Sequence, residues 1–132
     1  MTAREAGLRL MFDASALTKR YVSELGREHV LGLFALAGEV VIAAHCQTEV
    51  ASALLRRRRD GDLPPEEFDR AWAAAQRDIA DMTHIPLDAH VERFAFAAMG
   101  YGPLRAMDAL HVGSALSAGV DLFVTAGPPV PI

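Results

Sequence analysis

The sequence predicts an α/β fold in which a parallel sheet is sandwiched between helices. Short apolar segments alternate along the chain with longer segments in which apolar residues recur at helical spacing. Because strands that are apolar on both faces are typical of parallel sheets covered by helices, this alternation favours that class. The length of 132 residues suits one domain, which we expect to span residues 1–132.

The first third of the chain predicts one strand and two helices. LRLMF, residues 8–12, is typical of a short buried strand, and it ends at the polar turn DAS. A helix capped by Ser15 is expected to follow and to run to about Val22. A second helix is expected from Arg27 to Leu36.

The middle third predicts one further strand and two long helices. EVVIAA, residues 39–44, has the composition of the next buried strand. QTEVASALLRRRR, residues 47–59, consists of good helix formers and stops at the turn Asp60–Gly61. The segment 64–82 opens with proline and acidic residues, as helix N-termini often do, and continues at helical spacing.

The last third predicts two strands on either side of two helices. THIPL, residues 83–87, is a brief strand, and LDAHVERFAFAAM, residues 87–99, is a helix. Gly100 to Pro103 break the pattern before the last long helix, LRAMDALHVGSAL, residues 104–116. VDLFVTA, residues 120–126, is the last clear strand.

The composition excludes several classes of protein. Hydrophobic residues make up 52% and charged residues 23%, which argues against a disordered or fibrous chain. The net charge of -4 does not suit a protein that coats nucleic acid electrostatically. A single cysteine, Cys46, the lack of a leader pattern and the lack of a long apolar run predict a cytoplasmic protein without membrane contact.

Three acidic residues fall at positions that need an explanation. Asp13 directly follows the first strand and Glu49 follows the second, so both are expected at the carboxyl edge of the sheet. Asp108 lies between Met107 and Leu110, on what the spacing predicts to be a buried helix face. An unpaired carboxylate there would cost several kcal/mol, roughly the penalty for burying an isolated ion.

Each acid also has a purely structural interpretation. Asp13 suits a helix cap, Glu49 complements the positive end of its helix, and Asp108 is compatible with a satisfied hydrogen bond. Together, however, three carboxylates at one edge repel one another unless a cation neutralises them. Oxygen ligands favour Mg²⁺ (or Mn²⁺) over zinc, and such sites activate water for attack on a phosphodiester.

Four segments resemble the successive motifs of a known family. MFDASALTKRYVSE, TEVASALLRRRRDGDL, LRAMDALHVGSAL and DLFVTA look like those of PIN-domain ribonucleases, specifically the VapC toxins of bacterial toxin–antitoxin pairs. The match covers almost the whole chain in the right order. Its most specific part is the LRxxDALH block followed by a strand that ends in VTA.

The resemblance implies a function, a site and partners. It implies a Mg²⁺-dependent endoribonuclease toxin that cleaves structured cellular RNA, and a VapB-like antitoxin that blocks the acidic pocket. It also implies a homodimer, which we expect to use mainly helices between Leu25 and Met82, where Phe68 and Trp72 lie four apart. The implied catalytic and metal-binding acids are Asp13, Glu49 and Asp108, with the hydroxyls of Ser15 and Thr125 as supporting partners.

One departure from the family pattern leaves an alternative open. VapC toxins usually carry a fourth acid directly after VTA, where this chain has Gly127 followed by PPVPI. We therefore expect a shortened C-terminal strand and helix, with PVPI as a remnant of the strand. The alternative function is a protein of the same fold with weak or no activity that binds antitoxin or RNA.

Phosphate-transfer domains also place acids at strand ends, but residues at two positions of this chain argue against that class. Phosphate-transfer domains of the haloacid-dehalogenase type need a second acid two residues after the first, where this chain has Ser15. Receiver domains use a lysine late in the chain, and the only lysine here is Lys19.

Basic residues and histidines complete the set of candidates. The run Arg56–Arg59 suits phosphate binding, an acidic partner segment or a solvated helix end, whereas Arg105 is a candidate contact for a substrate phosphate. His111 is interpreted as a packing or hydrogen-bonding residue rather than a metal ligand. His45 and Cys46 lack partners at metal-binding spacing, so no zinc site is expected.

Overall fold

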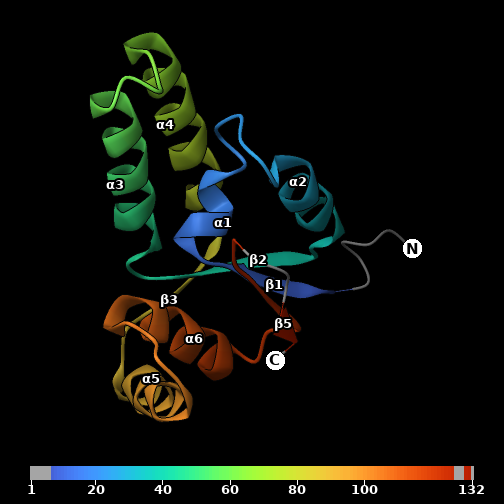
Figure 1. Ribbon diagram of the computed structural model, residues 1–132. Helices are drawn as coiled ribbons and strands as arrows, with labels where there is room; N and C mark the ends of the chain where they lie inside the picture. The colour runs from blue at the N-terminus through green and yellow to red at the C-terminus, as the bar shows by residue number, and fades with distance from the viewer. Residues whose placement is uncertain (1–6, 127–129, 132) are drawn as a thin grey trace.

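The computed structural model describes residues 7–126 and 130–131, whose strands form one sheet in the order β3-β2-β1-β4-β5 (Figure 1). β1 pairs in parallel with β2 and β4, and β2 pairs in parallel with β3. β5 lies antiparallel to β4 at the edge, so the predicted parallel sheet is confirmed and the PVPI segment adds a short antiparallel strand. The strands are β1 (Arg9–Phe12), β2 (Glu39–Ala43), β3 (Thr83–Ile85), β4 (Leu122–Val124) and β5 (Val130–Pro131).

Helices cover both faces of this sheet, as predicted (Figure 1). α1 to α4 lie on one face, and α5 and α6 lie on the other. None of the described helices is both long and apolar enough to cross a membrane. The helices are α1 (Ala14–Thr18), α2 (Arg27–Leu36), α3 (Cys46–Arg59), α4 (Pro65–Ala80), α5 (Ala89–Tyr101) and α6 (Ala106–Ala118).

The alternation of side chains along the strands builds a core on each face. In β1, Leu10 and Phe12 belong to the cluster that includes the buried side chains of α1, α3 and α4. Met11, between them, joins Phe123 and Ala115 in a smaller cluster on the α6 side. Both faces of β1 are therefore buried from Leu10 to Phe12, which explains why these three residues are all apolar.

Several predicted boundaries were wrong by a few residues. α1 ends at Thr18 rather than near Val22, and its cap is Asp13, whose Oδ1 accepts from the Ala16 amide at 2.9 Å, not Ser15. α5 continues through Gly100 to Tyr101. These short-range differences arise because tertiary packing, rather than propensity, determines where a short helix ends.

The predicted buried face of α6 was also wrong. Met107 is 53% exposed and Leu104 is 39% exposed, and Asp108 is exposed as well. α6 packs instead through small residues, since a Cβ added at Gly113 would lie 2.5 Å from the Val91 carbonyl oxygen of α5. Asp108 consequently bears no burial penalty. The buried residues of α6 are Ala109, His111, Gly113, Ser114 and Ala115.

Two aromatic residues of the segment expected to form a homodimer contribute to the core. Phe68 is only 8% exposed, and Trp72, which is half-buried, packs against the same core cluster. Large apolar side chains are exposed on α5 and α6, where Phe96 is 78% exposed, and also at Leu25 and Leu36. A homodimer that uses helices between Leu25 and Met82 therefore stays a prediction.

Candidate functional site

The site lies where the central parallel strands end. β1 continues into Asp13, whose amide donates to the Val124 carbonyl oxygen of β4 at 3.0 Å. After β1 the chain builds β2 and β3 on one side and then returns to form β4 on the other side. Such a reversal of strand order leaves a crevice at the carboxyl edge, which is the usual place for a ligand in open α/β sheets.

The three predicted acids meet at this edge. Asp13, Glu49 and Asp108 line one hollow of about 110 Å³ together with Ala14, Ser15 and His111. A wider hollow of about 490 Å³ shares Asp13, Ser15 and Asp108, and Thr125 also lines it. The five side chains that the resemblance implies are thus divided between two hollows, which share Asp13, Ser15 and Asp108, while Glu49 lines only the smaller and Thr125 only the wider one.

Asp13 is held in a fixed position by short-range contacts. Its Oδ1 accepts from the Ser15 hydroxyl at 2.7 Å and from the Ala16 amide at 2.9 Å. The Ser15 hydroxyl in turn accepts from the Ala126 amide at 3.2 Å. Ser15 thus joins the start of α1 to the end of β4 and orients the first acid.

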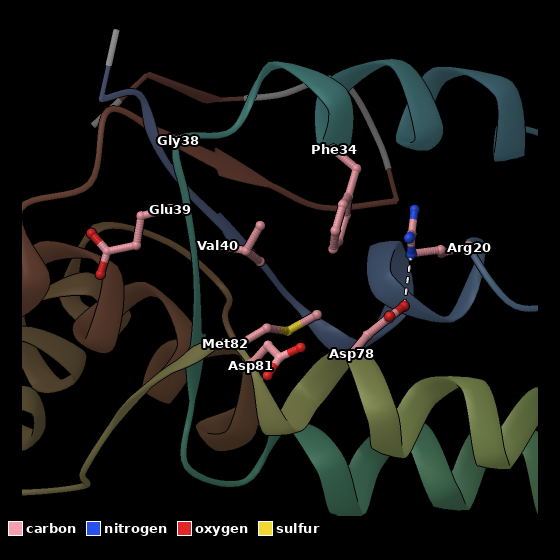
Figure 2. Close-up of a pocket in the computed structure, with 8 residues that line it drawn as sticks. All are labelled: Arg20, Phe34, Gly38, Glu39, Val40, Asp78, Asp81 and Met82. Carbon is pink, nitrogen blue, oxygen red and sulfur yellow. Dashed lines mark hydrogen bonds and ion pairs between the residues drawn. The ribbon is translucent and has the colours of Figure 1, made fainter. Parts of the chain in front are cut away.

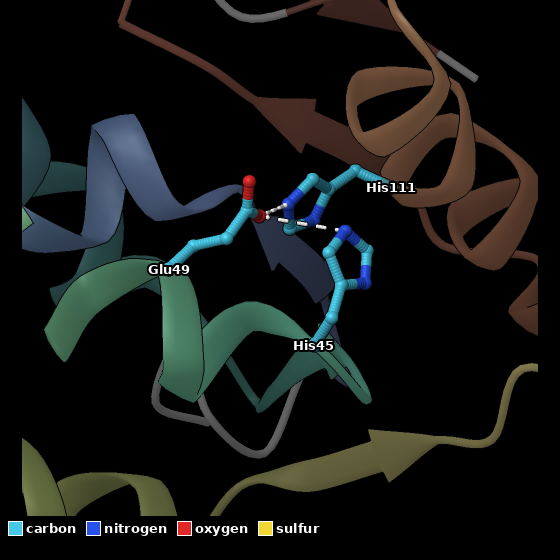
Figure 3. A group of neighbouring side chains, drawn as sticks. All are labelled: His45, Glu49 and His111. Atoms are coloured by element: carbon cyan, nitrogen blue, oxygen red, sulfur yellow. Dashed lines mark hydrogen bonds and ion pairs between the residues drawn. The ribbon is translucent and has the colours of Figure 1, made fainter. Parts of the chain in front are cut away.

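Glu49 is held by two histidines (Figure 3). The Nε2 of His111 donates to its Oε1, and the Nε2 of His45 lies 3.4 Å from the same oxygen. The two imidazole rings are tilted by 40° with centroids 4.2 Å apart. The other oxygen of Glu49 points away from both rings (Figure 3).

The environment of His45 keeps its ring neutral. Burial, and then the neighbouring His111, hold the pKa of His45 below its ordinary value. Its Nε2 lies 3.1 Å from the Met107 carbonyl oxygen, which only accepts hydrogen bonds. The proton of this ring is therefore on Nε2.

The group His45, Glu49 and His111 offers one set of possible metal ligands. One ligand atom from each lies within 4.8 Å of the others, which is compact enough for a transition-metal ion. An ion bound to both Nε2 atoms would move the ring protons to Nδ1. Both Nδ1 atoms are buried, and neither has a hydrogen-bond partner among the described residues. Metal-bound histidines usually donate that proton to an acceptor, and none of the described residues supplies one here.

The three carboxylates that line the hollow offer a different donor set, made of oxygen atoms alone. Asp13, Glu49 and Asp108 supply the oxygen ligands that Mg²⁺ and Mn²⁺ prefer, and Asp108 lies exposed in the first turn of α6. Cys46 does not add a thiolate, because burial raises the pKa of its thiol to about 12. The expectation that His45 lacks partners at metal-binding spacing was wrong, because Glu49 and His111 offer ligand atoms within 4.8 Å of its own.

The arginine run is divided between different roles. Arg57 pairs with Glu24 at 2.6 Å, and Arg58 lies over the Phe68 ring at 4.5 Å. Arg56 lines a hollow of about 420 Å³ that Ser15 and Glu49 also line. Arg105, in contrast, precedes α6 as an exposed residue and does not line the acid hollow.

A separate hollow of about 290 Å³ has a structural explanation (Figure 2). Arg20 donates to Asp78 at 2.9 Å and stacks on Phe34 at 4.0 Å. Glu39 accepts from Thr83 at 2.6 Å. Three of its four charged side chains, Arg20, Glu39 and Asp78, are paired, and it shares no lining residue with the acid hollow, so we assign it a structural role.

Sequence reasoning missed the contribution of the histidines to the environment of Glu49. His45 lies one helical turn before Glu49, and His111 lies one turn after Asp108, so both spacings were visible in the sequence. What the sequence did not supply was the contact across 62 positions that joins His111 to Glu49. Gly127, the position of the absent fourth acid, lies outside the described residues.

Comparisons with known proteins agree with this geometry. The sequence profile of the PIN domain matches residues 10–128. Two proteins of Mycobacterium tuberculosis, ribonuclease VapC45 and ribonuclease VapC49, are each 32% identical to the chain over 119 residues. The alignments cover 87% of this chain and 80% of each relative.

Solved structures share the fold at lower sequence identity. The crystal structure of Mycobacterium tuberculosis VapC20, a sarcin–ricin loop cleaving toxin, superposes with a TM-score of 0.67 at 16% identity, covering 89% of each chain. A chain of a toxin–antitoxin complex from Klebsiella pneumoniae superposes with a TM-score of 0.62 at 13% identity. That match covers 89% of this chain and 86% of the other.

Proposed function

The chain belongs to the PIN domain family and is similar to VapC ribonucleases, and from this premise we propose that it is a divalent-metal-dependent endoribonuclease toxin. The observation that carries the proposal is the meeting of Asp13, Glu49 and Asp108 in one small hollow at the carboxyl edge of the sheet. The substrate class is RNA, in keeping with the named activities of the relatives. RNA cleavage by the native chain and by acid-to-amide variants tests the assignment.

The proposed roles follow from the contacts of each side chain. The three carboxylates hold Mg²⁺ (or Mn²⁺), whose charge offsets their mutual repulsion. When bound, such an ion lowers the pKa of the water that attacks phosphorus. Ser15 orients Asp13 through its 2.7 Å hydrogen bond, and Thr125 faces the wider hollow, where its hydroxyl is suited to a hydrogen bond with substrate.

We expect Arg56 to contact an RNA phosphate beside the cleaved one. Arg56 follows Glu49 by seven residues, so it lies about 10 Å farther along the axis of α3. Ala53, between them, is small and lines the same hollow, which leaves room for a strand. Arg56→Gln is therefore expected to weaken RNA binding about three- to tenfold. It should also reduce the slope of log affinity against log salt concentration by about one.

Fluorescence anisotropy in the presence of a metal chelator measures this RNA binding without cleavage, because the chelator removes the divalent ion. Arg59→Gln is the matched control, because Arg59 is exposed on the same helix and does not line the hollow. Arg105→Gln tests the earlier expectation for Arg105 in the same assay. Equal losses for Arg56→Gln and Arg59→Gln would show that the run acts only as a solvated helix end.

We expect a VapB-like antitoxin to inhibit by placing a basic side chain among the acids. Because the hollow concentrates three carboxylates, it attracts a cation, and a guanidinium pairs well with carboxylates. Co-expression with a small VapB-like protein, if a neighbouring reading frame encodes one, should yield a complex that does not cleave RNA. Asp13→Asn combined with Asp108→Asn should weaken that complex at least about tenfold, and Asp69→Asn, exposed on α4, should not. An affinity that does not change on loss of both acids would contradict this mode of inhibition.

The absence of an acid at Gly127 favours a second candidate, a weak or inactive protein that binds RNA or antitoxin. Two ions about 3.5 to 4 Å apart each need carboxylates, and three acids hold one ion well. Gly127→Asp is therefore expected to tighten Mg²⁺ binding and to speed cleavage, as measured by calorimetry and a cleavage assay. Native protein that binds RNA without cutting it, with cleavage gained by Gly127→Asp, would establish the second candidate. If the substitution changes neither measurement, the missing acid has no such effect.

A further inference from the structure

Glu49 differs from the other acids of the site in how much support it needs. Asp13 has a short side chain that is fixed by its own helix cap, and Asp108 stands in the first turn of α6. Glu49 has a longer side chain that is 32% exposed. Ordering a glutamate side chain costs up to about 1.5 to 2 kcal/mol of rotamer entropy, so an unsupported Glu49 would bind an ion weakly.

His111 supplies that support from the opposite layer of the fold. It is 2% exposed, belongs to α6, and donates from Nε2 to Glu49 of α3. A carboxylate accepts hydrogen bonds only, so the proton of the ring is on Nε2.

His45 makes a second contact between the same two helices, this time from the start of α3 to the backbone of α6. It precedes α3, and its Nε2 lies 3.1 Å from the carbonyl oxygen of Met107, the residue before Asp108. The same nitrogen lies 3.4 Å from Glu49 Oε1. The contacts of the two histidines therefore tie the helix that carries Glu49 to the first turn of the helix that carries Asp108.

We propose that His111, assisted by His45, is the positioning residue for Glu49. Together they occupy Oε1, and the second oxygen of Glu49 points away from both rings (Figure 3). In this proposal, that second oxygen is the one left free to bind the cation. This inference rests on the proposed metal site, but it concerns residues that the acid motif does not include. The histidines act through Glu49 and do not bind the ion.

Metal affinity in the absence of RNA tests the proposal. His111→Leu removes the hydrogen-bond donor and replaces the imidazole with an apolar side chain of similar size. His111→Gln, in contrast, keeps an N–H donor near the position of Nε2. Loss of a residue that orients a metal ligand costs about 10- to 100-fold in affinity, so His111→Leu should weaken Mn²⁺ binding at least about tenfold in calorimetry. His111→Gln should recover affinity to within about threefold of native. His84→Leu, which removes a 2.8 Å contact to the Ile79 carbonyl outside the site, should leave it unchanged.

A second substitution keeps the test decisive if His111→Leu does not fold, which circular dichroism would reveal. His45→Leu, at a half-buried position, should weaken Mn²⁺ binding about two- to fivefold. RNA affinity in chelator should be native in all folded variants, because the histidines do not contact substrate.

Two results would overturn the proposal. Native Mn²⁺ affinity in folded His111→Leu, or in His45→Leu if the former does not fold, would show that Glu49 needs no such support. Tight Co²⁺ binding that is lost equally in His111→Leu and His111→Gln would make the histidine a metal ligand instead. Because these measurements need no cleavage, they remain informative if the chain proves inactive on RNA.

Discussion

Asp108→Asn is expected to lower RNA cleavage by a factor of about 1,000, equivalent to about 4 kcal/mol in the barrier. The substitution keeps the size of the side chain and removes one of the three charges that line the hollow. Asp13→Asn should have a similar effect. Because asparagine caps helices as well as aspartate does, that variant keeps the α1 cap and isolates the loss of charge.

Single-turnover cleavage at saturating Mg²⁺, combined with thermal unfolding in chelator, separates catalysis from stability. Removing a carboxylate relieves repulsion, so the metal-free variants should unfold at the native temperature or slightly above it. Asp69→Asn should cleave RNA at the native rate, since Asp69 is exposed on α4 and does not line the hollow. Native cleavage by Asp108→Asn would remove Asp108 from the site, and a large fall in its unfolding temperature would assign it a structural role.

Gly113→Ala is expected to destabilise the fold by about 3 kcal/mol. A Cβ at this position would lie 2.5 Å from the Val91 carbonyl oxygen and 2.9 Å from the Ala95 amide nitrogen, both backbone atoms of α5. Backbone cannot rotate away as a side chain does, so α5 and α6 must separate. Overpacking of this kind costs about 1 to 3 kcal/mol, and the loss of contacts along the helix pair places the effect at the upper end.

Urea denaturation measures this loss, with Gly100→Ala as the matched control. Gly100 lies in α5 and has no heavy atom within 4 Å of an added Cβ. Alanine there should be neutral or should stabilise by about 0.5 to 1 kcal/mol, because it reduces the entropy of the unfolded chain. Equal stability of the Gly113→Ala variant and native protein would mean that the two helices are not packed as closely as the structure has them.

The fold was largely predictable because its periodic patterns are strong. LRLMF and EVVIAA are mostly apolar because both faces of β1 and β2 are buried. The long helices, in turn, begin or end at residues typical of helix ends. The orientation of α6 was not predictable. Apolar residues surround this helix, and the buried face is set by the close approach of α5 at Gly113, which is a property of the helix pair.

The candidate site was predictable to the extent that strand ends determine it. Asp13 and Glu49 follow parallel strands, so their approach at one edge of the sheet needed no contact information. Asp108 was singled out because its helix face was predicted to be buried, and it lines the hollow although it is exposed. The support of Glu49 by His111 was not predictable, because nothing local to either residue names its partner in the other layer. The role of Arg56 was similarly not predictable, because the sequence does not distinguish the four arginines of the run, of which Arg56 and Arg57 line the hollow that Glu49 also lines.

RNA cleavage under control of the divalent ion tests the central claim most directly. Purified protein, stripped of metal with chelator, is incubated with cellular RNA, and new 5′ ends are mapped before and after Mg²⁺ or Mn²⁺ is restored. We predict discrete cuts that appear only with the ion, and that are absent in Asp13→Asn and Asp108→Asn under the same conditions. Cleavage at the same positions in excess chelator, or cleavage by both variants at the native rate, would contradict the proposal that these acids form a metal-dependent ribonuclease site.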